Sequence, residues 1–141
     1  MKLLGKRLLL VDDERAIRET LSAILRRYGL LVTAAAKISE ALDAIAKEDF
    51  DLLICDLNIE GESDGYQVIR AMKELNGRCI NIILTGNPAL GSAIEGIHLG
   101  IDDYIMKPAK PDTLIALLAE KLAARERKNN AKSASAENSF A

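Results

Sequence analysis

The chain alternates between short apolar runs and longer amphipathic segments. Five apolar runs stand out, at Leu8–Val11, Leu30–Ala34, Leu52–Cys55, Ile80–Leu84 and Tyr104–Met106. Near-continuous apolarity, without strict alternation of polar and apolar residues, is typical of parallel strands whose sheet is covered by helices on both faces. The runs therefore predict five strands of a parallel sheet.

The segments between these runs place apolar residues at helical spacing. Gly29 and Gly100 come where the first and fourth helices should end, and Pro88 and Pro111 lie near the starts of two helices. Five strand–helix units of an α/β fold result. The residues that carry the spacing are Ile17, Leu21, Ile24 and Leu25, then Ala41, Leu42 and Ile45, then Val68, Ile69 and Met72, then Leu90, Ala93, Ile94 and Ile97, and finally Leu114, Leu117, Leu118 and Leu122.

Length and composition predict one globular domain. The 141 residues suffice for a single core, and 49% hydrophobic with 28% charged residues is usual for a soluble protein. Residues 1–127 should form this domain. Residues 128–141 lack periodicity and are rich in Asn, Ser, Ala and Lys, which predicts a disordered tail or a truncated linker.

Charge and targeting signals exclude several classes of protein. Residues 1–119 carry 14 basic and 18 acidic side chains, and residues 120–141 carry five and three, so we expect no direct nucleic-acid binding. The chain shows neither a signal peptide nor an apolar run of membrane-spanning length. We therefore expect a cytoplasmic protein without membrane contact, in which Cys55 and Cys79 are reduced thiols.

Polar residues follow the predicted strands where a parallel sheet binds its ligands, at the carboxyl ends. Asp12 and Asp13 come after the first strand, Asp56 after the third, Thr85 after the fourth and Lys107 after the fifth. Neighbouring strands lie about 4.8 Å apart, so three carboxylates should crowd at one edge. Such crowding is unfavourable without a cation, and Mg²⁺ prefers carboxylate oxygens and water.

The order of these residues makes the chain resemble a known family. A strand ending in Asp12-Asp13-Glu14, a strand ending in Asp56, then Thr85 and Lys107-Pro108, are similar to the receiver domain of bacterial two-component response regulators. The similarity covers roughly residues 6–124. It implies a flavodoxin-like (βα)5 fold, a doubly wound five-stranded parallel sheet with strand order 2-1-3-4-5.

The resemblance also implies a role for each matching residue. Asp56 would be the phosphoacceptor, and Asp12, Asp13 and Asp56 would hold Mg²⁺ together with the backbone carbonyl of Asn58. Lys107 would pair with a phosphoryl oxygen. The phosphoryl group would come from a histidine kinase or a phosphotransfer protein.

Further residues would convert phosphorylation into a signal. In this family the hydroxyl of Thr85 donates to the phosphoryl group and the aromatic ring of Tyr104 rotates inward. The readout surface would be the fourth helix, the fifth strand and the fifth helix, and the peptide before Pro108 would be cis. A downstream effector protein or a missing output domain would receive the signal, and the chain could form a homodimer.

The chain departs from the family pattern in the loop after Asp56. Glu60 stands where a Pro is usual, Gly65 comes one residue late, and Glu62 adds negative charge. Gly86 replaces the Ala that commonly follows the Thr. Less bulk at Gly86 would admit water, so we expect a short-lived acyl phosphate.

Other interpretations of these residues remain open at the level of the sequence. Asp12 to Glu14 could serve only to cap the first helix. A Mg²⁺-dependent phosphohydrolase with an aspartyl nucleophile would use similar chemistry, although Asn58 stands where one such superfamily has a second Asp. A degenerate receiver that acts only as a binding platform is the third alternative. No helix-turn-helix follows the domain, so we expect output through a partner or through a missing domain.

Overall fold

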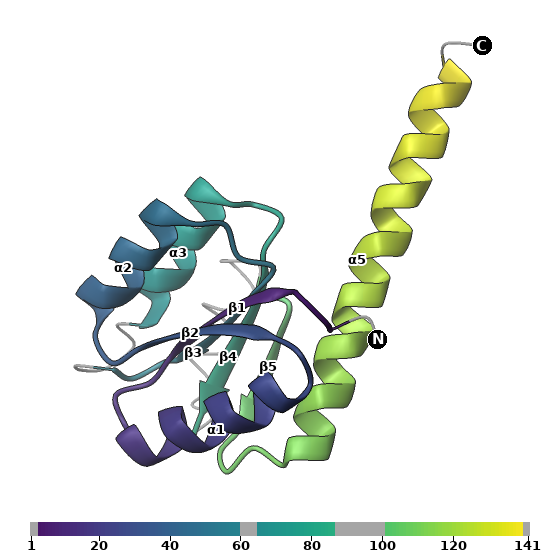
Figure 1. Cartoon of the computed structure of the whole chain (residues 1–141). Coiled ribbons are helices and arrows are strands. Elements are labelled where there is room, and N and C mark those ends of the chain that lie inside the picture. Colours follow the sequence, from purple (N-terminus) through teal and green to yellow (C-terminus); the bar gives the residue numbers. More distant parts are fainter. Residues whose placement is uncertain (1–2, 60–64, 87–100, 140–141) are drawn as a thin grey trace.

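A computed structural model describes residues 3–59, 65–86 and 101–139, and Figure 1 shows the arrangement of their helices and strands. The expected fourth helix, with Gly100 and Pro88, falls outside these ranges, as do Glu60 and Glu62. The elements are β1 (Arg7–Val11), α1 (Arg15–Arg27), β2 (Leu31–Ala35), α2 (Ile38–Lys47), β3 (Leu52–Asp56), α3 (Gly65–Leu75), β4 (Ile80–Thr85), β5 (Asp103–Met106) and α5 (Pro111–Ser139).

The five predicted strands are all present and form one sheet. Their order is β2-β1-β3-β4-β5, and every neighbouring pair is parallel. The five-stranded parallel sheet of a flavodoxin-like fold and its strand order are thus confirmed. The strand ends differ from the predicted ones by a residue at most, for example at β2, which begins at Leu31 instead of Leu30.

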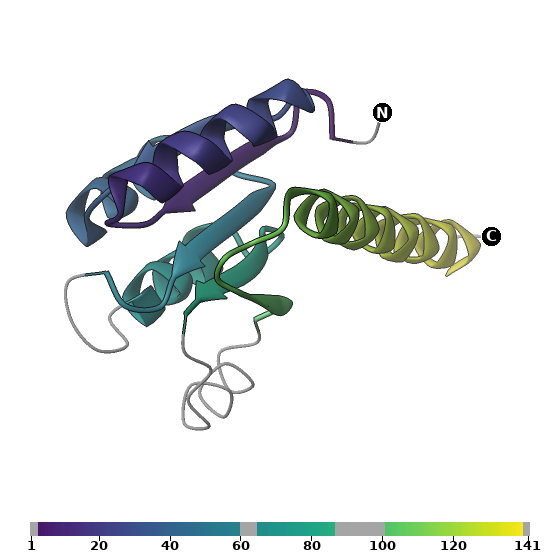
Figure 2. The same ribbon diagram turned by 90° about the horizontal axis from the view of Figure 1, so that it is seen from below.

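Helices cover both faces of the sheet (Figures 1 and 2), so alternate residues of a strand enter two separate cores. Leu9 and Leu53 pack on the side of α2 and α3, whereas Leu10 and Ile54 pack on the side of α1 and α5. All four side chains are fully buried. Burial of one such side chain contributes roughly 2 kcal/mol, which explains why the central strands are apolar without interruption.

The first helix ends as its sequence predicts. Gly29 follows α1 with φ 91°, a left-handed conformation that glycine adopts without strain. A Cβ on Gly29 would also lie 2.6 Å from Leu4 Cδ1. A side chain at this position would therefore disturb both the end of α1 and the chain that leads into β1.

The last helix is longer than predicted. α5 runs for 29 residues, about 43 Å at 1.5 Å per residue, and its second half extends away from the sheet (Figure 1). The disorder predicted from residue 128 is wrong in the structure, which continues the helix to Ser139. Residues 112–141 contain neither Gly nor Pro, and Ala is their commonest residue, so no helix breaker interrupts α5. The domain boundary at residue 127 stays a prediction.

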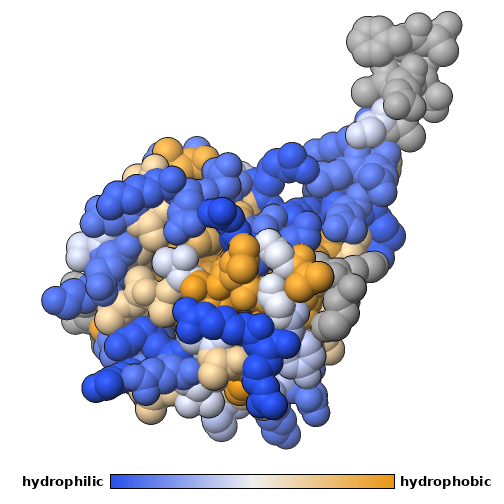
Figure 3. All heavy atoms as spheres, in the orientation of Figure 1, coloured by the Kyte–Doolittle hydropathy of each residue, from blue (hydrophilic) through white to orange (hydrophobic). Residues whose placement is uncertain are grey.

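Leu114 and Leu118 of α5 are fully buried, as is Leu122. They belong to the core between α5 and the sheet. Hydrophilic side chains, in blue, surround a small apolar area, in orange, on the face where edge strand β2 lies (Figure 3). In the part of the chain that the structure describes, no helix has the length and apolar character needed to cross a membrane.

Candidate metal and phosphoryl site

The carboxyl edge of the sheet brings together two buried carboxylates and one lysine. Asp12 follows β1, Asp56 ends β3, and Lys107 follows β5. Lys107 Nζ lies 2.9 Å from Asp12 Oδ2 and 2.9 Å from Asp56 Oδ2. The side chains of Asp12 and Asp56 are 0% and 7% exposed. Three strands that are distant in sequence thus place one cation between two anions.

Backbone groups and a third carboxylate complete the contacts. The N–H of Glu14 donates to Asp12 Oδ1 over 2.9 Å, and the N–H of Asn58 donates to Asp56 Oδ1 over 3.1 Å. Lys107 Nζ also lies 3.2 Å from Glu14 Oε1. Each buried carboxylate therefore has one oxygen held by the backbone and the other by Lys107.

Burial and charge act against each other in this cluster. Burial raises the pKa of the Asp12 carboxyl, and the Glu14 N–H and Lys107 offset this only in part. The Asp56 charge adds to the rise. Burial by itself would lower the pKa of Lys107, but Asp56 and Asp12 outweigh it, so the pKa of Lys107 is raised. The site therefore carries more negative charge than its lysine neutralises.

The donor set fits a divalent cation. Carboxylate oxygens of Asp12, Asp13, Glu14 and Asp56 all lie within 4.8 Å of one another. Oxygen ligands of one octahedral Mg²⁺, with bonds near 2.1 Å, lie roughly 3 to 4.2 Å apart. Small side-chain movements would therefore suffice for two or more of these carboxylates to share one ion, with water in the remaining positions.

The predicted switch residues differ in their relation to this cluster. Thr85 ends β4, is 3% exposed, and accepts the Lys107 N–H at its backbone oxygen over 2.7 Å. Thr85 is thus next to Lys107. Tyr104, which pairs with Ile83 across β4 and β5, is 47% exposed and is no part of the acidic cluster. The cis peptide between Lys107 and Pro108 is confirmed.

Two contacts were missed at the level of the sequence. Glu14 belongs to the acidic run after the first strand, but the sequence does not indicate its contact with Lys107. Arg18, one turn into α1, donates from Nη1 to the backbone oxygen of Asp12 over 2.9 Å. Its spacing from Asp12 could have suggested the contact, since a long side chain in the first turns of a helix can reach back to the preceding loop.

Gly65 explains how the loop after Asp56 closes. Its N–H donates to Leu57 O over 2.8 Å. A Cβ on Gly65 would clash with the backbone oxygen of Asp56 and would lie 2.9 Å from Leu57 Cα. Backbone atoms cannot move aside as a flexible side chain can. Glycine at this position therefore allows α3 to begin directly against the end of β3.

We expect Gly65→Ala to lower the free energy of unfolding by about 2 kcal/mol, because the added methyl group must displace the backbone around Asp56. Urea denaturation measures the change. Gly77→Ala is the control, since a Cβ there would meet only Lys73 O at an ordinary 3.6 Å. Equal effects of the two substitutions would contradict the close-approach explanation.

Comparison with known proteins assigns the family. The response regulator receiver domain family matches residues 8–119. The alginate biosynthesis transcriptional regulatory protein AlgB of Pseudomonas putida is 34% identical over 120 residues, 85% of this chain and 27% of that protein. The transcriptional regulatory protein ZraR of Escherichia coli K12 is 34% identical over 116 residues, 82% of this chain and 26% of that protein. The chain belongs to the response regulator receiver family, and it spans about a quarter of the length of these relatives.

Solved structures agree with this assignment. A CheY-like receiver domain protein from Methanospirillum hungatei JF-1 superposes with a TM-score of 0.83 at 32% identity, covering 88% of this chain and 98% of that one. A response regulator from Burkholderia pseudomallei with a phosphorylated aspartic acid, calcium ion and citrate gives a TM-score of 0.75 at 29% identity, covering 89% and 75%. The fold and the family thus define a phosphorylation-activated signalling domain.

Proposed function

We propose that Asp56 is the phosphoacceptor of this receiver domain and that Asp12, Asp13, Asp56 and the backbone carbonyl of Asn58 hold Mg²⁺. The observation that carries the proposal is the position of Lys107, whose ammonium group bridges Asp12 and Asp56 at 2.9 Å from each. A lysine held by two buried carboxylates can pair with an anion that arrives between them. The phosphorylated aspartic acid of the Burkholderia pseudomallei relative supports the same chemistry.

In the proposed reaction an Asp56 carboxylate oxygen attacks phosphorus. A new O–P bond forms as the bond between phosphorus and the donor's leaving atom breaks, and the electron pair departs with the donor. Phosphoryl transfer depends mainly on positioning and on neutralisation of charge. A bound Mg²⁺ would neutralise phosphoryl oxygens, and Lys107 would move its ion pair from Asp56 to one of those oxygens. The Asn58 N–H and the backbone around Gly65 hold Asp56 in position.

The switch would use Thr85 and Tyr104. Thr85 is buried at the end of β4 beside Lys107, where its hydroxyl could donate to the phosphoryl group. Tyr104 is 47% exposed, so an inward rotation would bury apolar surface that is now in water. Phosphorylation would thereby shift an equilibrium between two arrangements. The changed surface would be the fourth helix, β5 and α5.

The partners we propose follow from the family. The phosphoryl donor would be a histidine kinase or a phosphotransfer protein, and the receiver would act in the cytoplasm. AlgB and ZraR are transcriptional regulators about four times as long as the matched region, which supports an output domain or a separate effector as the recipient of the signal. We also propose that the chain can form a homodimer when it transmits the signal.

The enzymatic activity we propose is limited to the domain's own phosphorylation and dephosphorylation. Turnover of an ordinary phosphomonoester would instead support a phosphohydrolase. Gly86 is exposed. It also lies beside Lys107, because a Cβ on Gly86 would be 4.0 Å from Lys107 Cδ. Water can therefore approach, and we expect rapid hydrolysis of the acyl phosphate. A phosphorylated form that persists for hours would contradict that expectation.

Binding of Mg²⁺ tests the proposed metal ligands. We expect Asp13→Asn to weaken Mg²⁺ binding at least tenfold. Mg²⁺ usually binds only one or two protein carboxylates, and the substitution removes one of them. Titration followed by amide chemical shifts measures the affinity. Asp43→Asn changes the same charge at an exposed position of α2 and should leave the affinity within twofold. Equal effects of the two substitutions would show that Asp13 acts only through general charge.

A further inference from the structure

The backbone carbonyl of Asp12 is buried at the junction of β1 and α1, beside the proposed metal ligands. Asp12 is 0% exposed, so water does not reach this oxygen. Arg18, one turn into α1, donates to it from Nη1 over 2.9 Å, and no other hydrogen bond from a described residue reaches it. Buried acceptors are nearly always paired, and Arg18 provides the partner of this one.

The other polar groups of Asp12 are held as well. Its N–H donates to Ala35 O of β2 over 3.1 Å, and its Oδ1 accepts the Glu14 N–H over 2.9 Å. Its Oδ2 lies 2.9 Å from Lys107 Nζ. The hydrogen bond from Arg18 therefore holds the carbonyl side of Asp12, which is the side that leads to the next residue of the chain.

The direction of the Asp13 side chain depends on this hydrogen bond. The Asp12 carbonyl and the Asp13 N–H belong to one planar peptide unit, so a donor that holds the oxygen also fixes the plane. The following peptide unit is held at the Glu14 N–H. Asp13 is exposed, and no ion pair from a described residue holds its carboxylate. Its orientation within the acidic cluster is therefore set by the two peptide planes beside it.

Arg18 acts on the backbone rather than on the carboxylates. Burial raises the pKa of the Asp12 carboxyl, and the Asp56 charge adds to the rise. The Glu14 N–H and Lys107 oppose this rise, and Arg18 is not among the groups that shift the pKa. The Arg18 guanidinium also forms no ion pair with a described residue. Its contact with the Asp12 carbonyl is thus a directional hydrogen bond and not a general neutralisation of the cluster.

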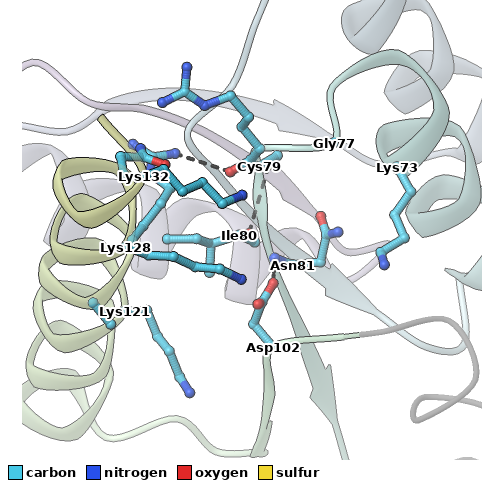
Figure 4. Close-up of a pocket in the computed structure, with 13 residues that line it drawn as sticks. Lys73, Gly77, Cys79, Ile80, Asn81, Asp102, Lys121, Lys128 and Lys132 are labelled. Carbon is cyan, nitrogen blue, oxygen red and sulfur yellow. Dashed lines mark hydrogen bonds between the residues drawn. The ribbon is translucent and has the colours of Figure 1, made fainter. Parts of the chain in front are cut away.

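The basic side chains of α3 and α5 cannot replace Arg18. They line a basic cavity of about 390 Å³ at the start of β4 (Figure 4). β4 runs from Ile80, on the wall of this cavity, to Thr85, whose backbone oxygen accepts the Lys107 N–H. Five residues of strand span about 16 Å. In the described part of the chain, Arg18 and Lys107 are therefore the basic side chains that contact Asp12.

We propose that Arg18 is a positioning residue of the metal site, whose hydrogen bond to the Asp12 carbonyl holds the peptide from which Asp13 reaches Mg²⁺. The inference rests on the proposed function, because it takes Asp13 to be a ligand of Mg²⁺. Replacement of a residue that orients a metal ligand typically weakens metal binding roughly 10- to 100-fold. Arg18 acts through one peptide unit, so we expect an effect at the lower end of this range.

Arg18→Met tests the proposal, because Met keeps the apolar stem of the side chain and removes the donors. We expect Mg²⁺ binding to weaken about tenfold, measured by titration of the amide chemical shifts, which also show that the variant is folded. Charge alone predicts the opposite sign, since loss of a cation near the site would strengthen the binding of Mg²⁺. The direction of the change therefore separates positioning from general electrostatics.

Two further variants serve as matched controls. Arg15→Met removes the same charge from the same helix, but the Arg15 side chain is 82% exposed and its Nε donates to Glu19. It should leave the affinity for Mg²⁺ within twofold. Arg18→Lys keeps one charged donor and should weaken binding no more than threefold.

Two readouts distinguish positioning from a loss of stability. In EDTA, the NMR order parameter of the Asp13 amide should fall in Arg18→Met and stay unchanged in Arg15→Met. In the reaction with acetyl phosphate, Arg18→Met should need about ten times more Mg²⁺ for the half-maximal rate. Its rate at saturating Mg²⁺ should lie within twofold of the wild type, because the bound ion itself then holds Asp13.

Unchanged or tighter Mg²⁺ binding by Arg18→Met would overturn the role of Arg18. Equal weakening by Arg15→Met or by Arg18→Lys would do the same. Asp13→Asn belongs in the same series, because it tests the ligand itself. If Asp13→Asn binds Mg²⁺ as the wild type does, the proposed metal ligands are overturned. If it binds weakly and Arg18→Met binds normally, only the inference about Arg18 fails.

Discussion

The Asp56→Asn variant is expected to lose all response to beryllofluoride and Mg²⁺. Beryllofluoride occupies the position of a phosphoryl group only where a carboxylate oxygen can bind beryllium. The amide of Asn is too weak a ligand to bind beryllium and too weak a nucleophile to attack phosphorus. In the wild type we expect shifts of the backbone amides of Thr85, Tyr104 and Lys107. In Asp56→Asn these shifts should be absent, as NMR spectra of the two proteins can show.

Asp43→Asn serves as the matched control for Asp56→Asn, because it removes an exposed carboxylate on α2. It should respond as the wild type does. Asp56→Asn removes an ion pair with Lys107 but also relieves repulsion from Asp12, so its free energy of unfolding should change by no more than about 1 kcal/mol. If a folded Asp56→Asn protein still showed the wild-type shifts, Asp56 would not be the phosphoacceptor.

The Lys107→Gln variant is expected to be less stable than the wild type by roughly 2 to 3 kcal/mol at neutral pH without Mg²⁺. Lys107 is the cation that the described residues place between Asp12 and Asp56, and its side chain is only 14% exposed. Without it two buried carboxylates face each other. Mg²⁺ should restore much of the loss and should therefore stabilise the variant more than the wild type, as urea denaturation with and without the metal can measure.

The pH dependence of this loss follows from Asp12. Burial raises the folded-state pKa of Asp12 above the ordinary 3.8, so the folded protein binds the proton more tightly than the unfolded chain. Stability from this group is therefore present at acidic pH and is lost as pH rises through the raised pKa. Removal of Lys107 raises that pKa further, so the deficit of Lys107→Gln should be larger at a neutral pH than at an acidic pH.

Lys110→Gln is the control for the lysine substitution, because Lys110 is exposed and forms no ion pair with a described residue. It should be as stable as the wild type at both pH values. A Lys107→Gln protein that gains no more from Mg²⁺ than the Lys110→Gln protein would contradict the electrostatic coupling of Lys107 to the metal site.

The sheet was predictable because its sequence signal is local. Each strand is an apolar run, and the parallel arrangement requires the residues after Val11, Cys55 and Met106 to meet at one edge. That rule alone predicts that Asp12, Asp56 and Lys107 lie close together. The resemblance to the family supplied the strand order and the cis peptide, which the apolar pattern does not contain.

Other features depend on three-dimensional proximity and could not be predicted in this way. The need for glycine at residue 65 arises from the approach of α3 to the Asp56 backbone, which no local pattern reveals. The basic cavity depends on α3 and α5, which are distant in sequence, lying beside the start of β4. The helical continuation beyond residue 128 differs from what the polar composition predicts, because Asn and Ser indicate disorder whereas the Ala and Lys residues between them favour helix.

The measurement that tests the central claim most directly is the location of the phosphoryl group after reaction of the wild-type chain with acetyl phosphate. The aspartyl phosphate can be reduced with borohydride and mapped by mass spectrometry of peptides, in parallel samples with Mg²⁺ and with EDTA. We predict modification at Asp56 alone, and only with Mg²⁺. Modification at another residue, or equal modification in EDTA, would contradict the account.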